Sequence, residues 1–173
     1  MKTTNTIRTL TTAALIAAMY TVLTVCLAPL SYGLVQCRLS EALTILAAFT
    51  PAAIPGLTVG CVVSNLIGLS SGANIAGALD VLLGPLATGI AAWLTWLLRN
   101  RRIGGLPLWS TLPPVVLNAL VIGTELAFVA PQFTVEMWVI EMGLVAAGQL
   151  VACVGGGLLV ARCLQVSGLD KRL

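Results

Sequence analysis

Long apolar stretches limit what this chain can fold into. Five segments of about 18 residues or more carry at most two charged residues each, and they are about 10–29, 52–69, 76–98, 112–130 and 134–161. An α-helix needs roughly 20 apolar residues to cross the hydrocarbon core of a bilayer. The chain is 58% hydrophobic and only 9% charged, whereas soluble domains carry about 25% charged residues. This pattern predicts an all-α membrane protein with a single transmembrane domain over residues 1–173.

The basic residues are distributed unevenly between the ends of these segments. Loops rich in Lys and Arg stay on the cytoplasmic side of the membrane during insertion. We therefore predict that both termini and the loop near residue 100 are cytoplasmic. The basic residues that define this side are Lys2, Arg8, Arg99, Arg101, Arg102, Arg162, Lys171 and Arg172, whereas Arg38 lies on the other side with Glu41, Asp80, Glu125, Glu136 and Glu141.

This topology requires a sixth helix. Only three long segments precede the basic loop at 99–102, but a cytoplasmic N-terminus requires an even number of crossings before it. A short helix ending at Pro51 would supply the fourth crossing, since helices commonly stop before a proline. The alternative is that 39–50 forms a re-entrant or interfacial helix, as runs of this length often do. The prediction is a compact bundle of six transmembrane helices at about 9–29, 38–50, 52–69, 76–98, 112–130 and 134–162.

Small residues recur at helical spacing in three of the predicted helices. Such faces let two membrane helices approach closely, and we interpret those of the third and sixth helices as packing faces. The pattern of the first helix lies just after Arg8; spacing alone favours internal packing there, with a docking surface for a partner as the alternative. The residues are Gly56, Gly60, Ser64 and Gly68 in the third helix, Gly143, Ala147, Gly148 and Gly155–Gly157 in the sixth, and Ala13, Ala14, Ala17 and Ala18 in the first.

Ionisable side chains within apolar segments are costly and usually mark function. The six-helix arrangement predicts that they all lie at a similar outer depth. Arg38 and Glu41 are three residues apart and could form a local ion pair. Glu125 and Glu141 have no other base available, and such carboxylates favour a small, flat, nitrogen-rich ligand that offers N–H donors. The predicted binding residues are Gln36, Arg38, Glu41, Asn65, Asp80, Glu125, Trp138 and Glu141.

Several other functions are disfavoured by what the sequence lacks. The chain has no His and no HExxH, GxSxG or phosphate-loop motif, so we expect no enzyme activity, no metal site and no cofactor. Its basic residues flank membrane segments instead of forming a patch with aromatic residues, which argues against nucleic-acid binding. Polar residues in the inner half are few, mainly Asn118 and Gln149, so a site open to the outside fits better than a conducting path.

Five segments resemble the queuosine-precursor transporter family, whose members are substrate-binding S components of energy-coupling factor importers. The segments are 28–43 (APLSYGLVQCRLSEAL), 49–56 (FTPAAIPG), 60–65 (GCVVSN), 80–88 (DVLLGPLAT) and 118–125 (NALVIGTE). The resemblance implies a multi-pass protein of the cell membrane that captures a 7-deazaguanine such as preQ1, preQ0 or queuine from outside.

The same resemblance implies partners. A transmembrane coupling subunit would contact Ala13, Ala14, Ala17 and Ala18, and two ATPase subunits would hydrolyse ATP. The loop 30–38 would close over the substrate. Two alternatives stay open, namely an S component for another vitamin or nucleobase-like compound, and a stand-alone cation-coupled carrier.

Overall fold

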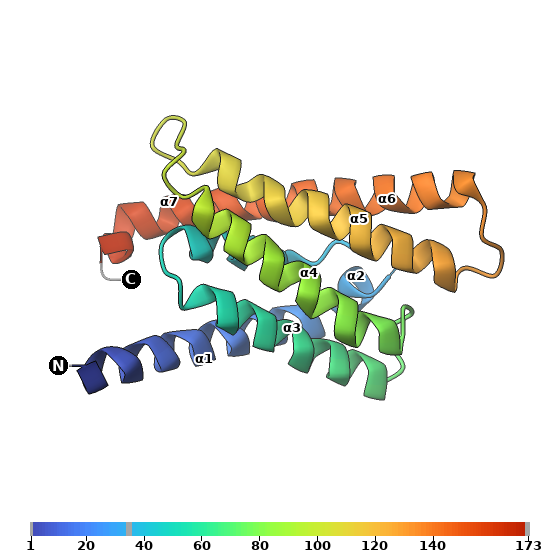
Figure 1. Ribbon diagram of the computed structural model, residues 1–173, viewed down its shortest axis with the longest axis horizontal. Helices are drawn as coiled ribbons and strands as arrows, with labels where there is room; N and C mark the ends of the chain where they lie inside the picture. The colour runs from blue at the N-terminus through green and yellow to red at the C-terminus, as the bar shows by residue number, and fades with distance from the viewer. Residues whose placement is uncertain (1, 34–35, 172–173) are drawn as a thin grey trace.

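The computed structural model describes residues 2–33 and 36–171, which form an all-helical bundle (Figure 1). Part of the predicted closing loop, Leu34 and Val35, and the basic residue Arg172 lie outside the described residues. The α-helices are α1 (Lys2–Cys26), α2 (Ala28–Ser31), α3 (Ala53–Ser70), α4 (Ala78–Leu97), α5 (Leu112–Val129), α6 (Val135–Gln149) and α7 (Gly157–Ser167). Three 3-10 helices, η1 (Leu39–Ala48), η2 (Leu108–Thr111) and η4 (Leu169–Lys171), and a π-helical segment, η3 (Leu150–Gly156), complete the order.

Within the described residues, five helices are long and apolar enough to cross a membrane, and their ends lie within six residues of those of the five predicted segments. They comprise residues 6–26, 53–70, 78–97, 108–129 and 135–167. The last runs through α6, η3 and α7 without a break. Pro113 and Pro114 occupy the first turn of α5 as expected, where a proline costs no helical hydrogen bond. Pro85 lies inside α4.

The predicted short helix at 38–50 is present as η1, a 3-10 helix of ten residues. At about 2.0 Å per residue it covers about 20 Å, which is shorter than the roughly 30 Å hydrocarbon core. Every residue from Ser40 to Ala48 is buried, and η1 contacts α1, α3, α4, α7 and η3. The segment is therefore an interior element of the bundle, surrounded by the long helices.

The direction of α1 relative to α3 shows that the chain reverses between them. A Cβ atom built on Gly56 would lie 2.7 Å from the carbonyl oxygen of Ala13, and one on Gly60 would lie 2.9 Å from that of Ala17. Because both residue numbers increase together, the two helices are parallel. Residues 27–52, which include η1, must therefore return along the bundle before α3 begins (Figure 1).

The loops divide between two ends of the molecule. The start of α1, the α4–α5 connection at 98–107 and the end of α7 lie at one end, on the left of Figure 1. We call it the basic end, because the connection carries Arg99, Arg101 and Arg102. The α3–α4 and α5–α6 loops lie at the opposite end.

The small-residue faces are only partly used for packing. Gly56 and Gly60 bring α3 against α1, as predicted. The prediction for the sixth helix is wrong for Gly143 and Gly155, because a Cβ atom at either would meet nothing within 4 Å. Gly156 does pack on η1, since its Cβ would lie 3.0 Å from that of Ala42.

The alanine pattern of α1 is divided between two faces. Ala13 and Ala17 lie against the glycines of α3 and are partly buried, so they serve internal packing. Ala14 and Ala18 are exposed. Ala18 lines a shallow apolar groove with Met19, Val22 and Leu23. Two of the four alanines, Ala14 and Ala18, thus lie on the exposed face of α1.

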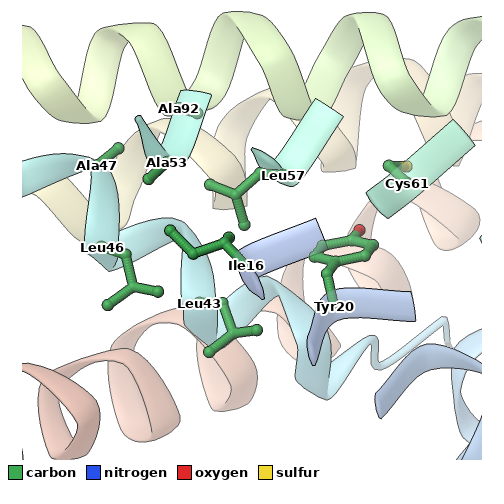
Figure 2. Close-up of a cluster of buried hydrophobic side chains, with 9 residues drawn as sticks. All are labelled: Ile16, Tyr20, Leu43, Leu46, Ala47, Ala53, Leu57, Cys61 and Ala92. Atoms are coloured by element: carbon green, nitrogen blue, oxygen red, sulfur yellow. The ribbon is translucent and has the colours of Figure 1, made fainter. Parts of the chain in front are cut away.

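Between α1, η1, α3 and α4 lies the main apolar cluster of the bundle (Figure 2). Its members are Ile16, Tyr20, Leu43, Leu46, Ala47, Ala53, Leu57, Cys61 and Ala92. Tyr20 and Cys61 lie at one edge of the cluster (Figure 2), and both contact the polar groups described next.

Candidate functional site

Arg38 and Asp80 form a buried ion pair, with relative side-chain exposures of 4% and 0%. The Nη2 atom of Arg38 donates to Oδ2 of Asp80, and its Nε atom donates to the carbonyl oxygen of Ser31 at 3.1 Å. Asn74 also donates to Asp80 Oδ2, at 2.9 Å, and Asn65 Nδ2 donates to the Asp80 carbonyl at 2.6 Å. This network joins the start of η1 to α3 and α4.

The alternative of a local Arg38–Glu41 ion pair is wrong. Arg38 precedes η1 with an extended backbone, at φ −82° and ψ 97°. The spacing rule for residues three apart applies only where both are helical. The guanidinium therefore pairs with Asp80 on α4.

Glu41 accepts hydrogen bonds on both carboxylate oxygens. Tyr20 donates to Oε1 at 2.5 Å and Thr88 donates to the same atom at 3.0 Å, while Thr44 donates to Oε2 at 2.9 Å. Thr88 lies eight residues beyond Asp80 on α4, about 12 Å along the helix, so the Glu41 carboxylate bonds to a residue nearer the basic end than Asp80. The expectation that all ionisable side chains share one outer depth is therefore wrong for Glu41.

Cys61 on α3 lies between these two networks. Its sulfur atom is 3.6 Å from Thr88 Oγ1, 3.7 Å from Asn65 Nδ2 and 4.0 Å from Arg38 Nη1. Cys61, Tyr20 and Thr88 were not among the residues predicted to form the site. Tyr20 could have been predicted from the sequence as a hydrogen-bonding residue of the interior, because a buried tyrosine usually finds a partner for its hydroxyl group.

Glu125, in contrast, has no hydrogen-bond partner on either oxygen, although it is only 3% exposed. It is close enough to the Arg38–Asp80 ion pair to interact electrostatically with both charges. Asn118 is seven residues earlier on the same face of α5, and its buried Nδ2 atom also lacks a partner. An unpaired buried carboxylate is strongly unfavourable unless another group compensates it.

Gln36 is another buried side chain without hydrogen-bond partners. It is 1% exposed, and neither its amide nitrogen nor its amide oxygen is hydrogen-bonded. Its backbone has φ +42°, the one positive φ of a non-glycine residue within 2–33 and 36–171. Such conformations are strained and cluster at ligand-binding and active sites.

Glu141 lies near the end of the bundle that carries the α5–α6 loop, opposite the basic end. It is buried, and its Oε2 atom has no hydrogen-bond partner. The residue lines an apolar cavity of about 290 Å³ together with Ile75, Leu126, Val129, Ala130, Pro131 and Met137. Glu141 is therefore a carboxylate in a largely apolar cavity close to the α5–α6 loop.

Trp138 does not join the buried residues. It is partly exposed, and its indole nitrogen donates to Thr124 Oγ1 at 2.9 Å, a contact that ties α6 to α5. Among residues whose burial is described, Arg38 is the one buried base, against Glu41, Asp80, Glu125 and Glu141. The described interior therefore holds four acidic side chains but one basic side chain to neutralise them.

Comparison with known proteins places the chain in a family. The sequence profile of the QueT transporter family matches residues 10–165. A curated relative, the queuosine precursor transporter QueT of Lactococcus lactis subsp. cremoris (strain MG1363), is 36% identical over 92 residues. The matched stretch spans 52% of this chain and 50% of the relative, about half of each. No solved structure matches the chain. Since the family profile covers nearly all of its length, the chain belongs to the QueT transporter family.

Proposed function

We propose that the chain is the substrate-binding S component of an energy-coupling factor importer and that it captures a queuosine precursor from outside the cell. The observation that carries the proposal is the buried Glu125 carboxylate, which has no partner on either oxygen. A 7-deazaguanine such as preQ1, preQ0 or queuine offers adjacent N–H donors that would satisfy it. The family and the name of the curated relative support this class of substrate.

The proposed topology is a multi-pass protein of the cell membrane with six crossings and both termini in the cytoplasm. Two observations support it. The chain passes between the two ends of the bundle six times if the stretch containing η1 is counted as one passage. The α4–α5 connection at the same end as both termini carries three arginines, as the positive-inside rule requires of a cytoplasmic loop.

The proposed partners are a transmembrane coupling subunit and two ATPases, because the chain has no phosphate-binding loop of its own. Ala14 and Ala18 are the exposed alanines of α1 and would carry most of the docking surface, while Ala13 and Ala17 are partly covered by α3. A flat, small-residue surface allows close approach of a partner helix.

Ligand binding tests the first part of the proposal. Purified protein in detergent is titrated calorimetrically with preQ1, preQ0, queuine and unrelated vitamins such as riboflavin. We expect saturable binding of at least one 7-deazaguanine and none of riboflavin. If the protein binds a vitamin and no 7-deazaguanine, it is an S component for another substrate. If it binds none of these compounds, the proposed substrate is wrong.

Partner dependence tests the second part. Uptake into vesicles is measured with the protein alone and with the coupling subunit and ATPases. We expect uptake with the partners only, and loss of both uptake and co-purification in the Ala14→Trp and Ala18→Trp variants, with ligand binding retained. Leu82→Trp, on the exposed face of α4, is the matched control. Uptake by the protein alone would instead identify a stand-alone cation-coupled carrier.

A further inference from the structure

The buried carboxylates of the bundle differ in the number of ion pairs and hydrogen bonds that the protein itself supplies to them. Asp80 is neutralised by Arg38 and also accepts from Asn74, although its Oδ1 atom has no partner. Glu41 accepts three hydroxyl hydrogen bonds. Since hydrogen bonds to charged groups are among the stronger ones in proteins, these two carboxylates are held in place by the fold itself.

Glu125 differs from both. It is as deeply buried as they are, yet both of its oxygens are unpartnered. Its electrostatic partners are the ion pair itself, Asp80 as a repelling charge and Arg38 as an attracting one. The guanidinium is already bonded to Asp80 and to the Ser31 carbonyl. Since neither oxygen of Glu125 receives a hydrogen bond from the described residues, we expect a ligand with N–H groups to satisfy it.

The backbone of Gln36 is fixed two residues before Arg38. Its backbone N–H donates to the Gly33 carbonyl at 3.0 Å, and its carbonyl accepts from the Arg38 N–H at 3.1 Å. The following residue, Cys37, contacts the Gly148 carbonyl on α6 through its sulfur at 3.4 Å. These contacts hold the left-handed backbone of Gln36, while its buried amide has a free donor and a free acceptor.

We infer that Glu125 and Gln36 recognise the hydrogen-bonding edge of the ligand, whereas Arg38, Glu41 and Asp80 form the scaffold around it. This assignment rests on the proposed function. A 2-aminopyrimidin-4-one ring presents a ring N–H and an exocyclic amine side by side, which match the two oxygens of one carboxylate. The adjacent keto oxygen requires a donor, which the Gln36 amide supplies.

Two other buried side chains, Asn65 and Arg38, also carry N–H groups that could face the keto oxygen. Asn65 Nδ2 donates to the Asp80 carbonyl, and Arg38 is committed to Asp80 and Ser31. Both side chains therefore already have buried hydrogen-bond partners, whereas the buried Gln36 amide has none. A buried polar group without a partner is costly, so a bond from Gln36 to the keto oxygen gains the most.

The decisive experiment compares two ligands that differ only in the exocyclic amine, 7-deazaguanine and 7-deazahypoxanthine, on the full-length protein in detergent. One hydrogen bond to a charged group corresponds to a binding ratio of about 10-fold to 150-fold, and we expect wild type to prefer 7-deazaguanine by that ratio. In Glu125→Gln the ratio should fall below about 3-fold. In Glu41→Gln, the matched carboxylate control, the ratio should stay at the wild-type value.

Two further readouts separate recognition from structural damage. Without ligand, Glu125→Gln should unfold at a higher temperature than wild type, because it replaces an unpartnered buried carboxyl group with a neutral amide, whereas Glu41→Gln should unfold at a lower one. Gln36→Met, close in size to glutamine, should weaken both ligands about equally, by roughly tenfold, since both carry the keto oxygen. Glu125→Asp is the second variant at the key position and should also lose the preference.

The outcomes distinguish this inference from the function on which it rests. If wild type binds neither these two ligands nor preQ1, preQ0 or queuine, the proposed function fails and takes the inference with it. If wild type prefers 7-deazaguanine but Glu125→Gln and Glu125→Asp keep the full preference, only the inference is overturned. A loss of preference in Glu41→Gln with an unaltered Glu125→Gln would reverse the assignment of the two carboxylates.

Discussion

Adding one methyl group to Gly60 tests how α1 is held against α3. In Gly60→Ala the new Cβ atom would lie 2.9 Å from the carbonyl oxygen of Ala17 and 2.9 Å from the Cβ atom of Tyr20, whereas ordinary contacts begin near 3.4 Å. Neither neighbouring atom can rotate away, because one is backbone and the other is attached to it. The two helices must therefore move apart by about half an ångström.

The expected cost follows from two opposing effects. Overpacking of a tight interface costs about 1–3 kcal/mol, while alanine is favoured over glycine inside a helix by about 1 kcal/mol. Gly143→Ala on α6 gains the same helix propensity without a clash, since no atom lies within 4 Å of its new Cβ. The difference between the two variants isolates the steric cost of about 1–3 kcal/mol, or about 2–12 °C in Tm.

Thermal unfolding in detergent, followed by tryptophan fluorescence, measures this difference. We expect Gly60→Ala to unfold below wild type or close to it and Gly143→Ala to unfold at or above wild type. The shift of α1 also moves Tyr20 away from Glu41, so ligand binding should weaken in Gly60→Ala and not in Gly143→Ala. Equal Tm values for the two variants would refute the close parallel packing of α1 on α3.

Three further predictions concern the buried polar network and α1. Asp80→Asn leaves the Arg38 charge buried without its partner and should lower the free energy of unfolding by about 3–5 kcal/mol. Combining it with Arg38→Gln should recover part of this loss in a double-mutant cycle of unfolding free energies. If the effects of the two substitutions simply add, the ion pair is contradicted. Tyr20→Phe removes one charge-assisted hydrogen bond from Glu41 and should cost about 1.5–3 kcal/mol in the same assay, so an unchanged Tm would argue against that bond. Ala17→Trp places an indole against the glycine face of α3 and should prevent recovery of folded monomer in size-exclusion chromatography, whereas a folded monomer would show that this face is open.

The sequence alone determined the parts of this protein that depend on local composition. Hydrophobic length is a property of each segment by itself, so the five long helices follow from apolar runs with few charges. Pro113 and Pro114 predict the start of α5 for an equally local reason, since proline suits a first helical turn. The family could also be recognised from short motifs in the chain.

The partners of the buried side chains were decided only by the tertiary structure. Spacing suggested that Arg38 pairs with Glu41, but the extended backbone at residue 38 directs the guanidinium to Asp80. The position of η1 inside the bundle then places Glu41 among hydroxyl groups and leaves Glu125 without a donor. Helical periodicity relates Ala13 to Ala17, yet it cannot say which face of α1 meets α3. Contacts between distant segments depend on how every helix packs, and no local pattern contains that information.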